Sequence, residues 1–135
     1  MGTWAEIRDG MKTRLATISG LTARDVMPKV VADKNFAAVV YGDPLLLPAA
    51  HAGKVSVSVL VIVRVSRGGN IDDAQDAIDA YLWPTGASSI IAAVNGDRTL
   101  GSKVDDTRWV RTGSVGVLED GALQADISFQ CMVTP

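Results

Sequence analysis

The chain has 135 residues, which is the length of one domain and is enough to bury a core without disulfides or structural metals. Hydrophobic residues make up 47% and charged residues 21%, which excludes an intrinsically disordered chain. The formal net charge is -2, from 13 basic and 15 acidic residues, and no long run of one sign occurs. We therefore expect a single domain over residues 1–135 that does not bind nucleic acid tightly through its phosphates.

Three features predict a soluble, intracellular protein. Cys131 is the only cysteine, so neither an intrachain disulfide nor a cysteine zinc cluster can form, which suits a reducing cytoplasm. The N-terminal residues lack the apolar segment of a secretory signal. The most apolar run, residues 55–65, is too short and too interrupted by serine to span a bilayer, so no membrane partner is expected.

The first predicted element is a helix from Thr3 to Ser19. Thr3 is a suitable N-cap, Glu6 completes a capping-box pattern, and Gly20 is a suitable stop. Apolar residues recur at spacings of three and four, as in an amphipathic helix: Trp4, Ile7, Met11, Leu15 and Ile18. A short extended piece is expected at residues 21–26, ended by Pro28.

Residues 36–41 are apolar throughout and predict a short strand that is buried on both faces, and Gly42, Asp43 and Pro44 then turn the chain. Between Pro44 and Pro48 stand three leucines, Leu45, Leu46 and Leu47. Proline removes a donor from a sheet ladder, so we expect these leucines in a loop. Leucines in such a loop either pack under their own domain or face another chain, and both alternatives stay open.

The strand predicted at residues 54–65 organises the chain, because every odd position from Val55 to Val65 is valine. This period of two predicts one wholly apolar face against the core. The other face holds Lys54, Ser56, Ser58 and Arg64, with Leu60 and Ile62 in its middle. Helices on both sides of the sheet would explain these two apolar side chains, and so would a neighbouring subunit.

Helical spacing returns after the turn at Gly68-Gly69-Asn70. The predicted helix has an apolar stripe from Ile71 to Leu82, and Asn70 or Asp72 caps its N-terminus, where Asp72 and Asp73 suit the helix dipole. The segment from Trp83 to Gly86 ends this helix. Ser88 is expected to cap a second short helix over residues 89–94.

The C-terminal part predicts two further strands. Residues 106–118 form a candidate strand in which Gly113 and Gly116 mark bulges or bends, and Asp120-Gly121 is a hairpin turn. Residues 123–133 show the clearest alternation after that of the valine strand. The element order predicts an α+β domain, namely a largely antiparallel sheet with an N-terminal helix and a central helix pair packed on one face.

No set of residues predicts catalysis, a cofactor or a metal site. His51 stands alone in a loop, and Cys131 is expected as a buried filler in the last strand. The aspartates at positions 72, 73, 76 and 79 fit a helix start and its solvated face, and Asp105-Asp106 fits a strand-entry turn. Arg108 and Arg111 beside Trp109 fit a solvated sheet face better than a single-strand binding site. The alternatives are a small hydrolase or transferase that uses His51 or the aspartate face, or a generic host binding module.

The succession of segments resembles the tail terminator proteins of long-tailed bacteriophages, especially phages of actinobacteria, and the related head-tail connector and neck proteins. The segments that carry the resemblance are Ile18-Ser19-Gly20-Leu21, residues 37–40, the valine-rich strand, the helix at residues 73–82, Ser88-Ser89-Ile90, Leu100-Gly101 and a β-rich C-terminus. They cover most of the chain in order, and it is their succession that carries the resemblance.

The resemblance implies a structural virion protein without enzymatic activity, assembled in the host cytoplasm and located at the tail-neck junction. Such proteins form a ring, usually a hexamer, that caps the tail tube at its final length and joins the tail to the head. The implied partners are further copies of the chain, the tail tube protein and the connector, and DNA passes through the lumen without specific binding. We expect the subunit or partner interface to include Leu45, Leu46, Leu47, Leu60, Ile62 and Arg64.

Overall fold

The computed structural model describes residues 3–24, 35–48, 53–66, 71–118 and 121–134. Its elements follow the chain in the order α1 (Trp4–Leu15), β1 (Thr22–Arg24), β2 (Phe36–Pro48), β3 (Val55–Val65), α2 (Ile71–Leu82), α3 (Ile90–Asn95), β4 (Asp106–Thr112), β5 (Gly116–Val117) and β6 (Leu123–Val133).

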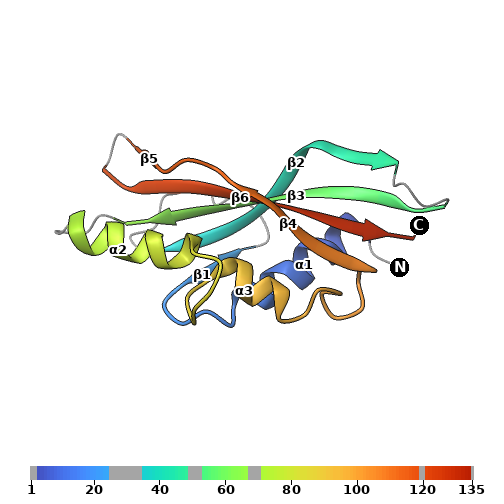
Figure 1. Ribbon diagram of the computed structural model, residues 1–135, viewed down its shortest axis with the longest axis horizontal. Helices are drawn as coiled ribbons and strands as arrows, with labels where there is room; N and C mark the ends of the chain where they lie inside the picture. Colours follow the sequence, from blue (N-terminus) through green and yellow to red (C-terminus); the bar gives the residue numbers. More distant parts are fainter. Residues whose placement is uncertain (1–2, 25–34, 49–52, 67–70, 119–120, 135) are drawn as a thin grey trace.

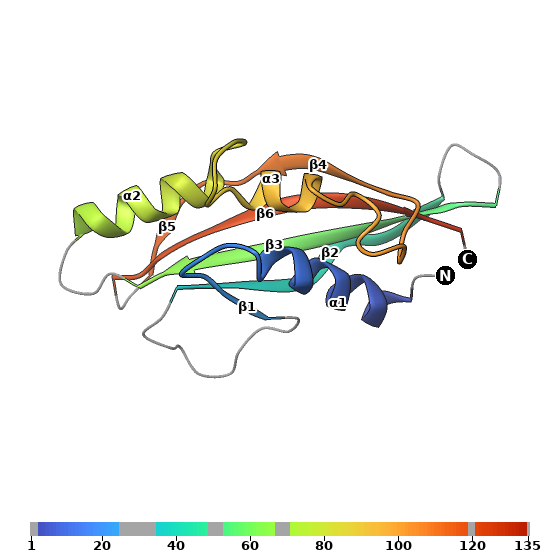
Figure 2. The ribbon, with the colours of Figure 1, turned by 90° about the horizontal axis from the view of Figure 1, so that it is seen from below.

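The strands form one six-stranded sheet in the order β1-β2-β3-β6-β4, and β5 pairs with β6 as well. The β1–β2 pair is parallel, and the other pairs are antiparallel. All three helices lie on the same side of the sheet, below it in Figure 1 and facing the viewer in Figure 2. The α+β fold class predicted from the sequence is therefore confirmed.

The alternation of β3 directs its valines into the core, as predicted. Each odd position from Val57 to Val65 is buried, and each even position from Ser56 to Arg64 is only partly buried. The buried valines pair with the buried positions of β6, for example Val59 with Phe129 and Val61 with Ile127. Burying one such side chain contributes about 1.5–3 kcal/mol, so these two central strands supply a large part of the core.

Helix α1 begins where the sequence predicts and ends earlier. Thr3 Oγ1 accepts a hydrogen bond from the Glu6 N–H at 3.3 Å, and the Thr3 N–H donates to Glu6 Oε1 at 3.3 Å, which completes the capping box. The helix ends at Leu15 and not at Ser19. The Thr17 N–H donates to the carbonyl of Arg14 instead of continuing the helical ladder, which tightens the last turn.

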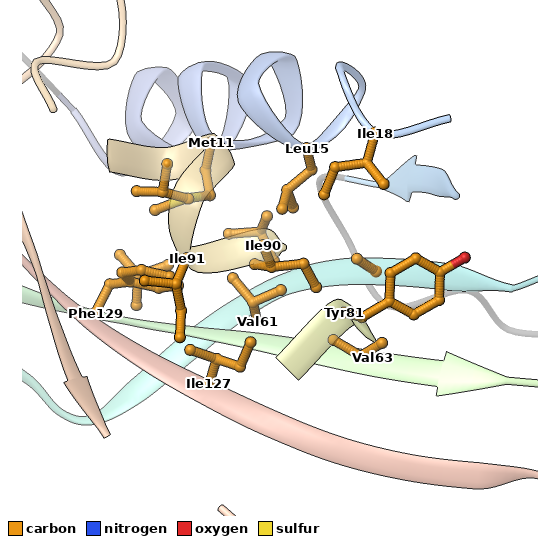
Figure 3. Close-up of a cluster of buried hydrophobic side chains, with 14 of the residues drawn as sticks. Met11, Leu15, Ile18, Val61, Val63, Tyr81, Ile90, Ile91, Ile127 and Phe129 are labelled. Carbon is orange, nitrogen blue, oxygen red and sulfur yellow. The ribbon is translucent and has the colours of Figure 1, made fainter. Parts of the chain in front are cut away.

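The helices cover the valine face of the sheet. Figure 3 shows Met11, Leu15 and Ile18 directed toward Ile90 and Val61, with Ile127 on the sheet below them. All of these side chains are buried and belong to one core cluster. The early end of α1 therefore does not expose Ile18, which still packs into the core from the turn that follows.

The prediction of a turn and loop after Tyr41 is wrong, because β2 continues to Pro48. Tyr41 pairs with Val59 and Leu46 with Val57, so residues 42–45 form a bulge opposite Ser58 alone. Pro44 falls inside this bulge, where no regular ladder donor is needed, and Pro48 is the last residue of the strand. The predicted burial of residues 36–41 on both faces holds for residues 36–39 and is wrong at the end of this run, because Val40 is only partly buried and Tyr41 is 61% exposed.

Three smaller boundaries also differ from the prediction. Ser89, and not Ser88, caps α3, because its hydroxyl accepts the Ala92 N–H at 3.1 Å. The strand expected at residues 106–118 is divided into β4 and β5 by residues 113–115, in agreement with a bend at Gly113. The extended piece expected at residues 21–26 contains β1, which pairs with β2.

Candidate assembly surface

The side of the sheet opposite the helices is named here the open face. Its side chains alternate with those of the core along β3 and β6: Ser56, Ser58, Leu60, Ile62 and Arg64, with Gln124, Asp126, Ser128, Gln130 and Met132. All of them are partly buried. Within the described ranges no helix covers this face (Figure 1). The sequence allowed two explanations for Leu60 and Ile62, namely helices on both sides of the sheet or a neighbouring subunit. The described residues do not support the first of these.

Leu60 and Ile62 belong to an apolar stripe that crosses two strands. Leu60 pairs with Val40 of β2, and Ile62 pairs with Ala38. On the β6 side the same residues pair with Ser128 and Asp126, so the stripe ends there. An apolar stripe bordered by polar side chains is the composition expected where a second protein surface excludes water.

Arg64 is held in place without a carboxylate. Its Nε and Nη2 donate to Gln124 Oε1 at 3.1 and 2.7 Å, and its guanidinium carbon lies 5.3 Å from the centroid of the Phe36 ring. A neutral amide and an aromatic ring orient the guanidinium but leave its charge uncompensated. Arg64 can therefore pair with an acidic group from outside the chain.

The open face is hollowed between the bulge of β2 and strand β4. The hollow has a volume of about 420 Å³, and its lining includes Gly42, Ser58, Leu60, Val110, Arg111 and Ser128. In Figure 1 the second half of β2 rises above the sheet on one side of this region. This trough combines apolar side chains, among them Leu60 and Val110, with the hydroxyl of Ser128 and the charged groups of Arg111 and Asp126.

The six predicted interface residues fall into two groups. Leu60, Ile62 and Arg64 share the open face, whereas Leu46 pairs with Val57 and therefore lies on the helix side of the sheet. Leu46 is 58% exposed, so it does not pack under its own domain. Leu45 lies in the bulge and Leu47 pairs with Ser56 through the backbone; the side chains of both lie outside the described part.

Sequence reasoning missed several exposed apolar side chains that lie outside the leucine segment. Tyr41 is 61% exposed and stacks on Trp4 of α1 with ring centroids 4.8 Å apart. Trp83, just after α2, is 67% exposed. The remaining ones lie on and after β4: Trp109, Val110, Val115 and Val117. Tyr41 gives no sequence signal of its exposure because it ends the apolar run of residues 36–41, and Trp83 is marked only as the start of the segment that ends α2.

The side chains that could have taken part in chemistry are Cys131, the aspartates of α2 and His51. Cys131 is buried as predicted, its Sγ lies 3.6 Å from Thr107 Oγ1, and burial raises the pKa of its thiol to about 11, which keeps it protonated. Asp73, Asp76 and Asp79 lie on the exposed face of α2. No group of three metal-ligating side chains occurs among the described residues. His51 lies outside them.

The arginines beside Trp109 are exposed, as predicted for a solvated strand. Arg108 Nη2 donates to Gln130 Oε1 at 3.1 Å, and Arg111 makes no hydrogen bond or ion pair within the described part of the chain. Trp109 Nε1 donates to Thr112 Oγ1 at 3.2 Å, so the indole lies along its own strand. Val110 is an extra residue in β4, since Trp109 pairs with Phe129 and Arg111 with Ser128.

No protein-family model matches this chain, and no curated protein matches it either. Among the described residues no helix is long and apolar enough to cross a membrane.

Proposed function

We propose that this chain is the subunit of a ring that caps a bacteriophage tail tube at its final length and joins the tail to the head. The proposal begins from the succession of segments that resembles the tail terminator proteins. In this function the chain works through its surfaces, and DNA passes through the lumen of the ring without being held.

The open face is the observation that carries this function. Leu60 and Ile62 form an apolar stripe on a face that no described helix covers, and Arg64 beside them lacks a carboxylate partner within the described residues. Leu60 and Ile62 are only partly buried in the monomer, so a neighbouring subunit that covers their exposed parts gains the hydrophobic free energy of burial. Leu46 and Tyr41 add exposed apolar surface on the other side of β2.

A closed ring needs head-to-tail contacts between two different surfaces of each subunit. The open face and the exposed side chains of Tyr41 and Leu46 on β2 lie on opposite sides of the sheet. They can therefore contact different neighbouring molecules. This division is compatible with a ring, in which one surface contacts the next copy and another contacts the tube or the connector.

The direct test is to mix the purified protein with tail tubes and to examine the tubes by negative-stain electron microscopy. The expected result is a ring at one end of each tube and no further growth of the tube when more tube protein is added. The variant Ala5→Lys is the control for added surface charge and should cap tubes as the wild type does, because Ala5 is exposed on α1, away from the open face.

Tubes that remain bare and continue to grow would overturn the tail-terminator function. Binding to connector complexes without any binding to tubes would also overturn it and would assign the chain to the head side of the junction.

A further inference from the structure

We infer that the open face of one copy binds helix α2 of a second copy. These two surfaces together form the contact between neighbouring subunits. This inference rests on the proposed function, because it names the contact by which that ring would form. It draws on three observations in the described residues: the charge of the open face, the charge of α2, and the positions of these two surfaces on the molecule.

The open face carries an excess of positive charge. Arg64, Arg108 and Arg111 lie on it. In the strand register they are opposite three residues of this face on β6: Gln124, Gln130 and Ser128. Asp126 is the one opposing carboxylate in the centre of this face, and Asp106 at its edge is already paired with Arg98 at 2.8 Å. The arginines therefore outnumber the unpaired carboxylates within the described part of this face.

Helix α2 carries the opposite charge. Its sequence, IDDAQDAIDAYL, contains four aspartates and no basic residue. Asp76 and Asp79 are exposed and form no ion pair within the described residues. Four residues after Asp79, the exposed Trp83 borders a hollow of about 410 Å³ that Ala80 also lines. An aromatic side chain beside acidic groups is a suitable anchor for a basic, partly apolar surface.

The two surfaces lie on opposite sides of the sheet, because α2 packs below it and the open face lies above (Figure 1). One copy therefore cannot bring them together, and a two-fold dimer cannot either, because its single contact patch would have to contain both surfaces of each copy. A contact between them is head-to-tail, and it leaves one surface of each kind free for the next copy. Such contacts produce a closed ring or a filament. Complementary charge steers this association and sets its register.

Charge reversal tests the contact. Asp76→Arg with Asp79→Arg should weaken assembly by about tenfold or more, and Arg108→Glu with Arg111→Glu should do the same. The two double variants mixed together should assemble again, because each supplies the charge that the other has lost. Asp9→Arg and Lys12→Glu on the exposed side of α1 are matched controls and should assemble normally. Sedimentation velocity measures assembly, and circular dichroism checks that every variant is folded.

Cross-linking tests the geometry independently of charge. A chain with Ala80→Cys and Ser128→Cys should form a ladder of disulfide-linked oligomers under mild oxidation, whereas each single variant should not. A mixture of the two single variants should give dimers only. The native Cys131 is buried and should not contribute.

The outcomes separate this inference from the function on which it rests. Rings that form normally in all charge-reversed variants and give no ladder would overturn the α2 contact and leave the capping function intact. A ladder together with rings that never bind tubes would support the contact and overturn the capping function. A protein that stays monomeric at every concentration would overturn both.

Discussion

Gly42 of β2 crosses so close to Ser58 of β3 that a methyl group on Gly42 would lie 2.5 Å from the Ser58 Cβ. Non-bonded carbon atoms do not approach each other to this distance, so only glycine fits here without a shift of the backbone. The contact lies at the bulge where one residue of β3 opposes residues 42–45 of β2. It also lines the trough of the open face, so it links the course of β2 to the shape of the candidate assembly surface.

Replacement of this glycine should therefore destabilise the protein. Gly42→Ala is expected to lower the free energy of unfolding by about 1–3 kcal/mol, because the added methyl group meets the Cβ and backbone of Ser58 and forces the strands apart. Urea denaturation followed by circular dichroism measures the change. Gly116→Ala is the matched control, since its nearest neighbouring atom lies 4.0 Å from the new Cβ, and it should change stability little. Equal stability of the two variants would show that β2 and β3 are not in this close contact.

A second glycine places two opposing effects in competition. Alanine favours a helix over glycine by about 1 kcal/mol, so propensity alone predicts that Gly10→Ala stabilises α1. A Cβ on Gly10 would, however, lie 2.8 Å from both the Cβ and the carbonyl oxygen of Leu100. Leu100 is buried at a φ of 51° and has little room to move. We expect the contact to dominate and the variant to be less stable by about 1–2 kcal/mol. A thermal melt that shows a higher Tm would contradict the packing of α1 on this residue.

The buried thiol predicts how stability depends on pH. Burial raises the pKa of Cys131 from 9.0 to about 11, so the unfolded chain ionises at a lower pH than the folded one. The stabilising contribution is complete below pH 9 and is lost as the pH rises from about 9 to 11. At pH 10.5 the contribution of this thiol to the free energy of unfolding is lower than at pH 8 by an amount on the order of 2 kcal/mol. The free energy of unfolding of wild type and Cys131→Ala, measured at both pH values, isolates this effect from the other titrating groups. The wild type should lose more stability than the variant, and parallel losses would argue against a buried thiol.

The apolar stripe of the open face predicts a separation of assembly from folding. Leu60→Lys should impair assembly strongly and change the free energy of unfolding by less than about 1 kcal/mol, because Leu60 is only partly buried in the monomer. Val61→Lys is the contrasting variant, since Val61 is fully buried and its replacement should unfold the protein. Size-exclusion chromatography and thermal melts measure the two properties. Normal assembly of Leu60→Lys would remove Leu60 from the interface.

The sequence predicts those elements in which a local pattern and the tertiary environment agree. The valines of β3 alternate because one face of the strand meets the helices, and Thr3 with Glu6 completes a cap that needs no distant partner. The prediction for residues 42–48 is wrong because the prolines in this segment locally disfavour a strand. Pairing with β3, together with a bulge that contains Pro44, overrides that local preference.

The candidate surface could be predicted only in part for a similar reason. Leu60 and Ile62 interrupt a polar face within one strand, so the sequence alone marks them. That Leu46 lies on the other side of the sheet depends on the bulge, whose length no periodicity reveals. The trough and the positions of Arg108 and Arg111 depend on pairing between distant strands, which no local pattern contains.

The mass of the particle in solution tests the ring most directly. Sedimentation equilibrium over a wide range of protein concentration should give a single species whose mass is a fixed multiple of the 14.2 kDa chain, about six chains by the resemblance, and which does not grow further. A mass of 14.2 kDa at every concentration, with or without tail tubes, would contradict the ring.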